Sequence, residues 1–205
     1  MTENSSEKAE KLQVEGIIKD DKVTISNKDG IDDFYKNSYI GTLEEDEEGN
    51  ELLILEPIEV LLLIERHRLL LWEDNNKKKA QLDFQIAIQH LAQFDERLWQ
   101  KYIIYMDLRK RGYLVRTGYG DGIDFRVYKR GADFEKDVAK FLIYPVFEGA
   151  PIELKDLDKI SRVAMSSRKD LIVATVDRLS KAIYYSVKKF QILNKEESVE
   201  VEEDA

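Results

Sequence analysis

Cysteine is absent from this 205-residue chain, and histidine occurs only twice, as His67 and His90. Without thiols there are no disulfides and no thiolate metal ligands. Two histidines far apart in sequence cannot build a zinc site from nitrogen and sulfur ligands alone. Both lie in expected helices without an apparent carboxylate partner, so we expect ordinary helix-surface side chains there. The sequence therefore predicts neither a metal nor a cofactor.

Long apolar runs are also missing. No stretch of about 18 apolar residues could span a membrane. The first residues, Met1–Lys8, are polar and acidic and do not form a signal peptide. Hydrophobic residues make up 43% of the chain, enough for a sizeable core. We expect a globular, cytoplasmic protein with no membrane partner.

Positive charge is scarce overall but unevenly distributed. The net charge is −9, a poor match for a chain that holds RNA alone, because an acidic surface repels backbone phosphates. The segment 101–130 nevertheless carries eight Lys or Arg against three Asp, which gives 8 − 3 = +5. Acidic residues concentrate in Glu44–Glu48 and after Lys195. This pattern predicts a basic face on an acidic body.

Periodicity divides the chain into four parts. We predict a disordered tail over 1–11, an N-terminal α+β domain over 12–80, a C-terminal domain over 81–192 and an acidic tail over 193–205. In the N-terminal domain, alternating runs indicate strands over 12–18 and 22–26, and further strands around 39–43 and 52–55. Pro57 suits the first turn of a buried helix that runs to Arg66. The charged stretch 73–79 is expected to be an exposed connector.

In the second half, helical periodicity between Gln81 and Arg111 predicts one or two amphipathic helices. Strands are then expected over 113–116, 124–128, 141–147, 171–176 and 182–187, with a helix between 154 and 168. Pro145 favours an edge or bulged position for its strand, because proline cannot donate to a sheet ladder. The fold class predicted is α+β, with two small mixed α/β domains and, in the second, a mixed sheet flanked by helices.

Several separated blocks carry a family resemblance. The stretches 107–118, 124–128 and 167–177, followed by Tyr184-Tyr185, resemble the C-terminal domain of archaeal tRNA-splicing endonucleases, a domain of the restriction-endonuclease-like type. In that family a Tyr, a His ten residues later and a Lys form a metal-independent triad that cleaves RNA. The matching positions here are Tyr128, Val138 and Lys169, so the histidine is replaced by valine.

The resemblance also implies the chemistry that this valine interrupts. In the family, the Tyr takes a proton from a ribose 2′-hydroxyl that attacks the phosphorus, and the His protonates the departing 5′-oxygen. The Lys stabilises charge on the phosphoryl oxygens. The products are a 2′,3′-cyclic phosphate and a 5′-hydroxyl. A general acid contributes roughly 10²–10⁴ in rate, and Val138 has no titratable group to supply it.

Other matching positions imply binding roles. Arg162 aligns with an arginine that clamps a bulge nucleotide, and Tyr128 and Lys169 are candidates to contact RNA. The turn Gly118–Gly122 lacks the cation found there in the family, and as a glycine-rich stretch it is typical of a tight turn. Loop residue Glu148, with Glu153 and Asp156, matches an acidic loop that enters a basic pocket of a neighbouring subunit. The C-terminal strand offers a pairing surface through Tyr184, Tyr185, Val187 and Phe190.

The function hypothesis that follows is a structural, non-catalytic subunit that assembles with a catalytic paralogue, as two heterodimers, to cleave introns from precursor tRNA at bulge-helix-bulge sites. Three alternatives stay open. Asp137 could replace the missing acid if burial raised its pKa. A metal-dependent nuclease could use Asp124 with Glu153 and Lys155. The chain could also be a scaffold outside RNA processing, with Tyr128, Lys169 and Arg162 as ordinary structural or surface residues.

Overall fold

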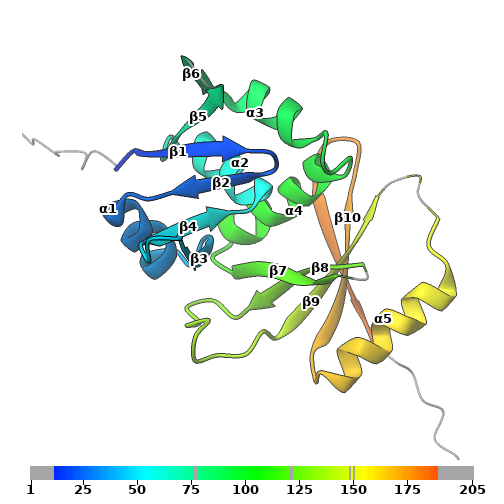
Figure 1. Cartoon of the computed structure of the whole chain (residues 1–205). Coiled ribbons are helices and arrows are strands. Elements are labelled where there is room, and N and C mark those ends of the chain that lie inside the picture. Colours follow the sequence, from blue (N-terminus) through cyan, green and yellow to red (C-terminus); the bar gives the residue numbers. More distant parts are fainter. Residues whose placement is uncertain (1–11, 76–77, 121, 148, 150, 189–205) are drawn as a thin grey trace, which may run out of the picture.

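The computed structural model describes residues 12–75, 78–120, 122–147, 149 and 151–188. Two mixed sheets and the helices around them make up this part of the chain (Figure 1). The first sheet has the strand order β3-β4-β2-β1-β5-β6. Its strands are β1 (Val14–Lys19), β2 (Lys22–Ile25), β3 (Thr42–Glu45), β4 (Glu51–Leu55), β5 (Leu69–Asn75) and β6 (Lys78–Leu82).

The second sheet has the order β11-β10-β9-β8-β7. Strands β9 and β10 run parallel, and all other neighbours are antiparallel. Its strands are β7 (Leu114–Gly120), β8 (Ile123–Tyr128), β9 (Phe141–Phe147), β10 (Asp170–Val176) and β11 (Ala182–Val187). The predicted fold class, two mixed α/β domains with sheets flanked by helices, is confirmed. The predicted domain boundaries remain a prediction.

The sequence analysis did not predict two elements of the N-terminal domain. The stretch 73–79 is not a connector, because β5 and β6 form a hairpin in which Asp74 pairs with Lys79 and Asn75 with Lys78. Backbone pairing at the edge of a sheet tolerates the charged side chains that suggested a loop. The other missed element is a short helix α1 (Lys28–Ile31), capped by Asn27, that continues into a π-helical turn over Asp32–Asn37 and buries Phe34.

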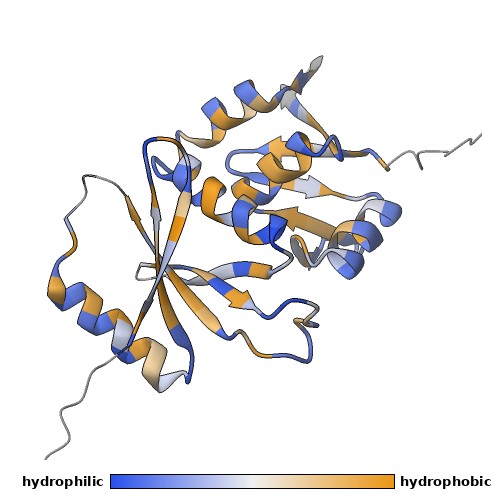
Figure 2. Cartoon of the chain, turned by 180° about the vertical axis from the view of Figure 1, so that it is seen from behind, coloured by the Kyte–Doolittle hydropathy of each residue, from blue (hydrophilic) through white to orange (hydrophobic). Residues whose placement is uncertain are grey.

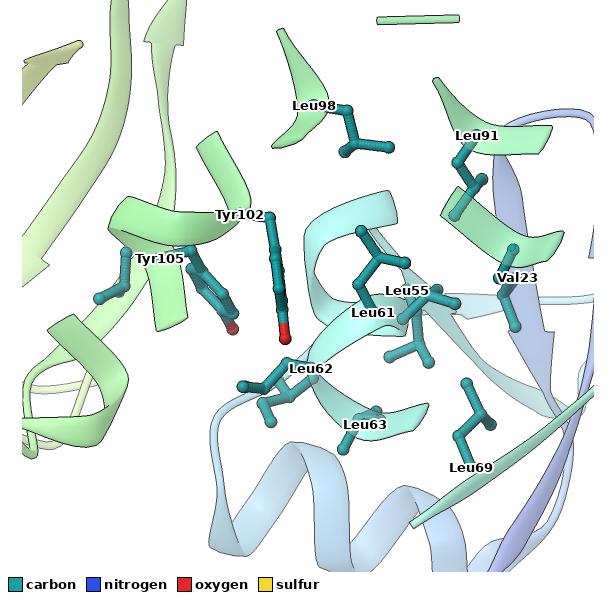
Figure 3. Packing of buried hydrophobic residues seen from close by; sticks show 14 of the residues in the cluster. Val23, Leu55, Leu61, Leu62, Leu63, Leu69, Leu91, Leu98, Tyr102 and Tyr105 are labelled. Atoms are coloured by element: carbon teal, nitrogen blue, oxygen red, sulfur yellow. The ribbon is translucent and has the colours of Figure 1, made fainter. Parts of the chain in front are cut away.

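Helices α2 (Pro57–Glu65) and α4 (Leu98–Lys110) form the centre of the molecule. Figure 3 shows Leu61 of α2 between Tyr102 of α4 and Leu55 of the first sheet, with Leu62 of α2 close to the tyrosine rings. Helix α3 (Phe84–Leu91) closes this core beside α2. One apolar cluster thus extends from the first sheet through α4 to the second sheet. None of the described helices is long and apolar enough to cross a membrane.

A buried carboxylate holds a backbone turn of the N-terminal domain beside this core. Glu59 of α2 is fully buried, and its two carboxylate oxygens accept the backbone N–H groups of Gly41 and Glu56, each at 3.0 Å. Burial raises the pKa of Glu59, although the two N–H donors oppose that rise. Gly41 has φ +82°, and a Cβ there would lie 2.5 Å from Leu53 Cδ1, so only glycine fits.

Arg116 of β7 attaches the second sheet to the same backbone turn. Its Nη1 donates to the carbonyl oxygens of Gly41 at 2.6 Å and Tyr39 at 3.3 Å. Arg109 of α4 donates from Nη2 to the carbonyl oxygen of Ser38 at 2.7 Å. Because carbonyl oxygens near the core need donors, Arg109 fixes this turn of the N-terminal domain against α4, and Arg116 fixes it against the second sheet.

The second sheet separates two faces. Side chains of Phe125, Val127 and Ile143 pack with the central core on the α4 side, whereas Leu142 and Leu171 pack beneath α5 (Leu154–Ser166) on the other. Figure 2 shows both hydrophilic and hydrophobic stretches along α5, as expected for a helix that covers a sheet with one face.

The sequence predicted an edge or bulged position for Pro145. Strand β9 is the third of five and so is not an outer strand, but Pro145 lies in a part of β9 that has no paired β8 residue beside it. Pairing between β8 and β9 ends at Phe125 and Ile143, two residues before Pro145, and the remainder of β9 pairs only with β10. A missing N–H at this point therefore removes no bond to β8.

The interdomain arginine makes a direct stability prediction. Replacing Arg116 with Ala should lower the free energy of unfolding by about 2 kcal/mol, because two carbonyl oxygens lose a charged donor. Arg116→Lys keeps the charge but not the fork of donors and should recover less than half of that loss. Urea denaturation of the three proteins measures both effects. Unchanged stability in Arg116→Ala would contradict this role.

Candidate functional site

Three strand ends meet at one edge of the second sheet. In the register of the sheet, Val127 of β8 pairs with Phe141 of β9, which pairs with Asp170 of β10. Because β8 runs opposite to β9 and β10, the end of β8 lies beside the beginnings of the other two. The backbone of Lys140 ties them together. Its N–H donates to the carbonyl of Val127 at 2.9 Å, and its carbonyl accepts the N–H of Asp170 at 3.0 Å.

These strand ends bring the three matching positions to one place. Tyr128 follows Val127, Lys169 precedes Asp170, and Val138 lies two residues before Lys140. Tyr128 is only 6% exposed and packs against Leu114 and Ala139. Lys169 is partly buried, and its Nζ donates to the carbonyl of Ser167 at 3.1 Å. Val138 and Lys169 lie ten and 41 residues after Tyr128 in the sequence, and the strand pairing of the sheet brings their backbone positions near one another.

Val138 is 83% exposed, so its isopropyl group contributes almost nothing to the core. A valine on the surface beside a tyrosine and a lysine has no packing role that would explain its presence. The position is therefore open to solvent and to any ligand at this edge, and its side chain can neither donate nor accept a proton.

The segment between β8 and β9, which carries Val138, is anchored on the N-terminal domain. The ring of Phe134 meets the rings of Tyr35 and Tyr39 edge-on, with centroids 5.8 Å and 5.2 Å away. The guanidinium of Arg116 lies 5.0 Å from the centre of the same ring. Aromatic contacts of this geometry add to the stability given by burial alone. The first domain thereby fixes the segment that crosses the site.

The alternative acid, Asp137, lies in an exposed turn of this segment. Its carboxylate accepts the backbone N–H of Asp133 at 2.9 Å, a bond that holds it within the turn. Asp137 is exposed and therefore lacks the buried setting that the alternative required. The geometry gives no support to Asp137 as a proton donor.

The proposed metal-binding triplet is not assembled either. Asp124 pairs with Lys101 at 3.4 Å, and Glu153 pairs with Lys155 at 2.5 Å. Within the described part of the chain, no group of three or more His, Cys, Asp or Glu side chains could hold a metal ion. Asp124 and Glu153 each have a lysine as partner instead of a shared cation.

Cations collect at the same edge as Tyr128. Each strand that begins or ends there carries exposed or partly exposed Lys or Arg residues next to it: Lys129 and Arg130 after β8, Lys140 before β9, and Arg168 and Lys169 before β10. Five cations at three adjacent strand ends create a local positive potential on a chain whose net charge is −9. These cations suit the edge to a polyanion.

The residues expected to contact RNA or a partner lie in different environments. Arg162 is exposed on α5 and pairs with Asp158 at 2.8 Å. Glu153 and Asp156 are exposed at the beginning of α5. Glu148 and Phe190 lie outside the described residues.

Strand β11 divides its predicted contact residues between both faces. Tyr184 lies on the α4 face, where its hydroxyl donates to Asp107 at 2.8 Å and its pKa is raised by burial and by that carboxylate. Val187 packs beneath α5. Tyr185 is 54% exposed and, with Ile183, leaves an apolar surface on the outer strand of the sheet.

Comparisons with known proteins agree with the geometry. A family model for the catalytic C-terminal domain of tRNA intron endonucleases matches residues 98–185, and a model for their N-terminal domain matches residues 14–83. The chain belongs to the tRNA intron endonuclease family.

Similar curated proteins, all named tRNA-splicing endonuclease, occur in methanogens. The protein of Methanococcus vannielii is 34% identical over 170 residues, which cover 83% of this chain and 90% of that relative. The protein of Methanococcus maripaludis is 35% identical over 170 residues, which again cover 83% of this chain and 90% of the relative. The protein of Methanothermobacter thermautotrophicus is 32% identical over 177 residues, or 86% of this chain and 97% of the relative.

Sequence reasoning missed several residues that shape this edge. Lys140 and Arg130 were not singled out, and neither was Phe134, which anchors the segment. Arg130 and Lys140 share one signal, because each lies within two residues of a predicted strand, whereas Phe134 lies midway between two predicted strands and has no such signal. Only the parallel pairing of β9 with β10 shows that these strand ends share an edge, and that pairing is not encoded in local periodicity.

The exposure of Val138 predicts that this position is free to change. Val138→His should alter the free energy of unfolding by no more than about 0.5 kcal/mol, because a surface substitution removes no core contact. Ala139→His, the matched change one residue later at a buried position, should destabilise the protein strongly. Thermal denaturation of both variants checks this. Equal losses would place Val138 in the core.

Proposed function

We propose that this chain is a structural, non-catalytic subunit of a tRNA-splicing endonuclease. It assembles with a catalytic paralogue, as two heterodimers, and the complex cleaves introns from precursor tRNA at bulge-helix-bulge sites in the cytoplasm. The observation that carries the proposal is the exposed Val138, which occupies the position where the family resemblance implies a histidine as proton donor.

The chemical argument concerns the leaving group. Attack by a ribose 2′-hydroxyl on the adjacent phosphorus expels a 5′-oxygen, which leaves poorly without a proton near neutral pH. A positioned general acid accelerates such a step by roughly 10²–10⁴. Tyr128 and Lys169 supply at most the base and the cation, because neither His67 nor His90 belongs to the segments that form this edge. The paralogue therefore performs the cleavage.

The RNA-facing role rests on the charge at the sheet edge. Lys129, Arg130, Lys140, Arg168 and Lys169 can neutralise phosphates there, while the rest of the acidic surface repels them. Folded RNA with unpaired bulges is recognised by shape, by splayed bases and by contacts to its phosphates, and the cations of this edge can make the phosphate contacts. In this account the chain helps to hold the precursor and leaves the reaction to its partner.

Assembly is assigned to the outer strand β11. Its free backbone edge, with Ile183 and Tyr185 exposed beside it, can pair with the corresponding strand of a related chain. Glu153 and Asp156, and with them Glu148, form the acidic element that contacts a neighbouring subunit.

The proposal predicts a dependence on the partner. The purified chain should leave a bulge-helix-bulge precursor intact, and addition of its triad-bearing paralogue should yield fragments with 2′,3′-cyclic phosphate and 5′-hydroxyl ends. Tyr185→Lys, which puts a charge on the proposed pairing strand, should prevent both complex formation and cleavage. Mass measurement of the mixture reports assembly independently of activity. Cleavage by the homogeneous chain at the rate of the mixture would refute the proposal.

A second prediction concerns a gain of function. If only the proton donor is missing, Val138→His should raise cleavage by the chain at least about 100-fold above its background, the lower limit for a general acid. Val138→Gln has similar reach without an acid and serves as the control. Adding Tyr128→Phe to Val138→His should remove the gain. No gain in a folded, assembled Val138→His protein would show that Tyr128 and Lys169 do not form a reactive arrangement.

A further inference from the structure

An apolar slot of about 290 Å³ lies on the α4 face of the second sheet. Its floor is formed by Val127, Phe141, Ile143 and Ile172, and Tyr113 and Tyr184 stand at its sides. Phe141, Ile172, Tyr113 and Tyr184 are only partly buried, so apolar surface faces solvent although α4 covers the neighbouring part of the sheet. Exposed apolar surface of this kind is a binding surface more often than a chance feature.

Two arginines border the slot. Arg111 lies 5.8 Å from the ring centre of Tyr184, and Arg130 lies 5.1 Å from that of Tyr113. Asp107 pairs with Arg111 at 2.8 Å, whereas no carboxylate among the described residues pairs with Arg130 in a salt bridge. The slot therefore suits a peptide segment in which apolar residues, which would lie in the slot, are followed by acidic residues, which would lie beside the arginines.

The chain itself continues with that order of residues. Val187 pairs with Leu171, so β11 ends at the edge where β10 begins, and Lys188 is the last residue described there. The sequence goes on with Phe190, Ile192 and Leu193. Six acidic residues follow against one lysine: Glu196, Glu197, Glu200, Glu202, Glu203 and Asp204, against Lys195.

The reach is sufficient. Neighbouring strands lie about 4.8 Å apart, so the middle of the slot over β9 is roughly 10 Å from β11. An extended chain covers about 3.3 Å per residue, so the four residues from Lys188 to Ile192 span about 13 Å. The acidic residues that follow Leu193 could then reach Arg130 and Lys140.

We propose that the C-terminal segment 190–204 of this chain covers the slot, with Phe190, Ile192 and Leu193 on its apolar floor and the following carboxylates beside Arg111 and Arg130. The first eleven residues are a poorer occupant, because they contain only Met1 and Ala9 as apolar residues. A consequence, which rests on the proposed function, is that the acidic segment competes with RNA phosphates for the basic edge.

The absence of native cysteine makes the test specific. Ile172→Cys in the slot is combined with Ile192→Cys in the segment, and a mild oxidant is added to the dilute full chain. A second pair, Arg130→Cys with Ile192→Cys, uses an exposed position and remains informative if Ile172→Cys impairs folding. The control pair is Met165→Cys with Ile192→Cys. Met165 is exposed on the opposite face and lines a groove together with Lys188, so it is no farther from the end of β11.

The proposal expects an intramolecular disulfide to form at least about tenfold faster in both slot pairs than in the control pair, as measured by mass and by gel mobility. Equal rates in the three proteins would show that the segment samples both faces without binding. A disulfide between two chains would assign the slot to a second copy. Either result would overturn the proposal and would leave the catalytic account of Val138 untouched.

Discussion

The two backbone hydrogen bonds of Lys140 are the constraint on which the site depends. By accepting from Asp170 and donating to Val127, this one residue fixes where β9 begins relative to both neighbours. A shift of one residue would turn Tyr128 to the other face of the sheet, since side chains alternate along a strand. The register that buries Leu142 beneath α5 and Ile143 beneath α4 is therefore the same register that brings Tyr128, Val138 and Lys169 to one edge.

The N-terminal domain supports this edge as part of the same folded body. Its core is continuous with that of the second sheet through α4. In addition, the carbonyl oxygens of Tyr39 and Gly41 in its turn accept hydrogen bonds from Arg116. The same arginine stacks on Phe134, which holds the segment between β8 and β9. The contacts that support this segment are therefore made by Arg116 and Phe134, whereas the exposed side chain of Val138 adds little to them and cannot exchange a proton.

The sequence predicted most of the second domain because its strands are short, alternating runs between glycine or charged turns. It failed at β5 and β6, where Leu69–Trp72 gives no alternation and the charged residues after it resemble a loop. For Pro145 it indicated an edge or bulged position, but it could not show that β9 is a central strand whose pairing with β8 stops partway, because such pairing cannot be read from one chain segment. Tyr128, Val138 and Lys169 were found through family motifs, but their convergence depends on the parallel pairing of β9 and β10. The cluster of cations at the edge depends on the same long-range contact.

The central claim is that catalysis resides in the partner and not at Tyr128 and Lys169. The most direct measurement is the cleavage rate of the assembled complex when Tyr128→Phe and Lys169→Ala are introduced into this chain alone, compared with the equivalent changes in the paralogue alone. The account predicts that changes here leave the chemical step within a few-fold of the unmodified complex, whereas changes in the paralogue abolish cleavage. Loss of cleavage from the changes in this chain, with assembly and RNA binding intact, would contradict it.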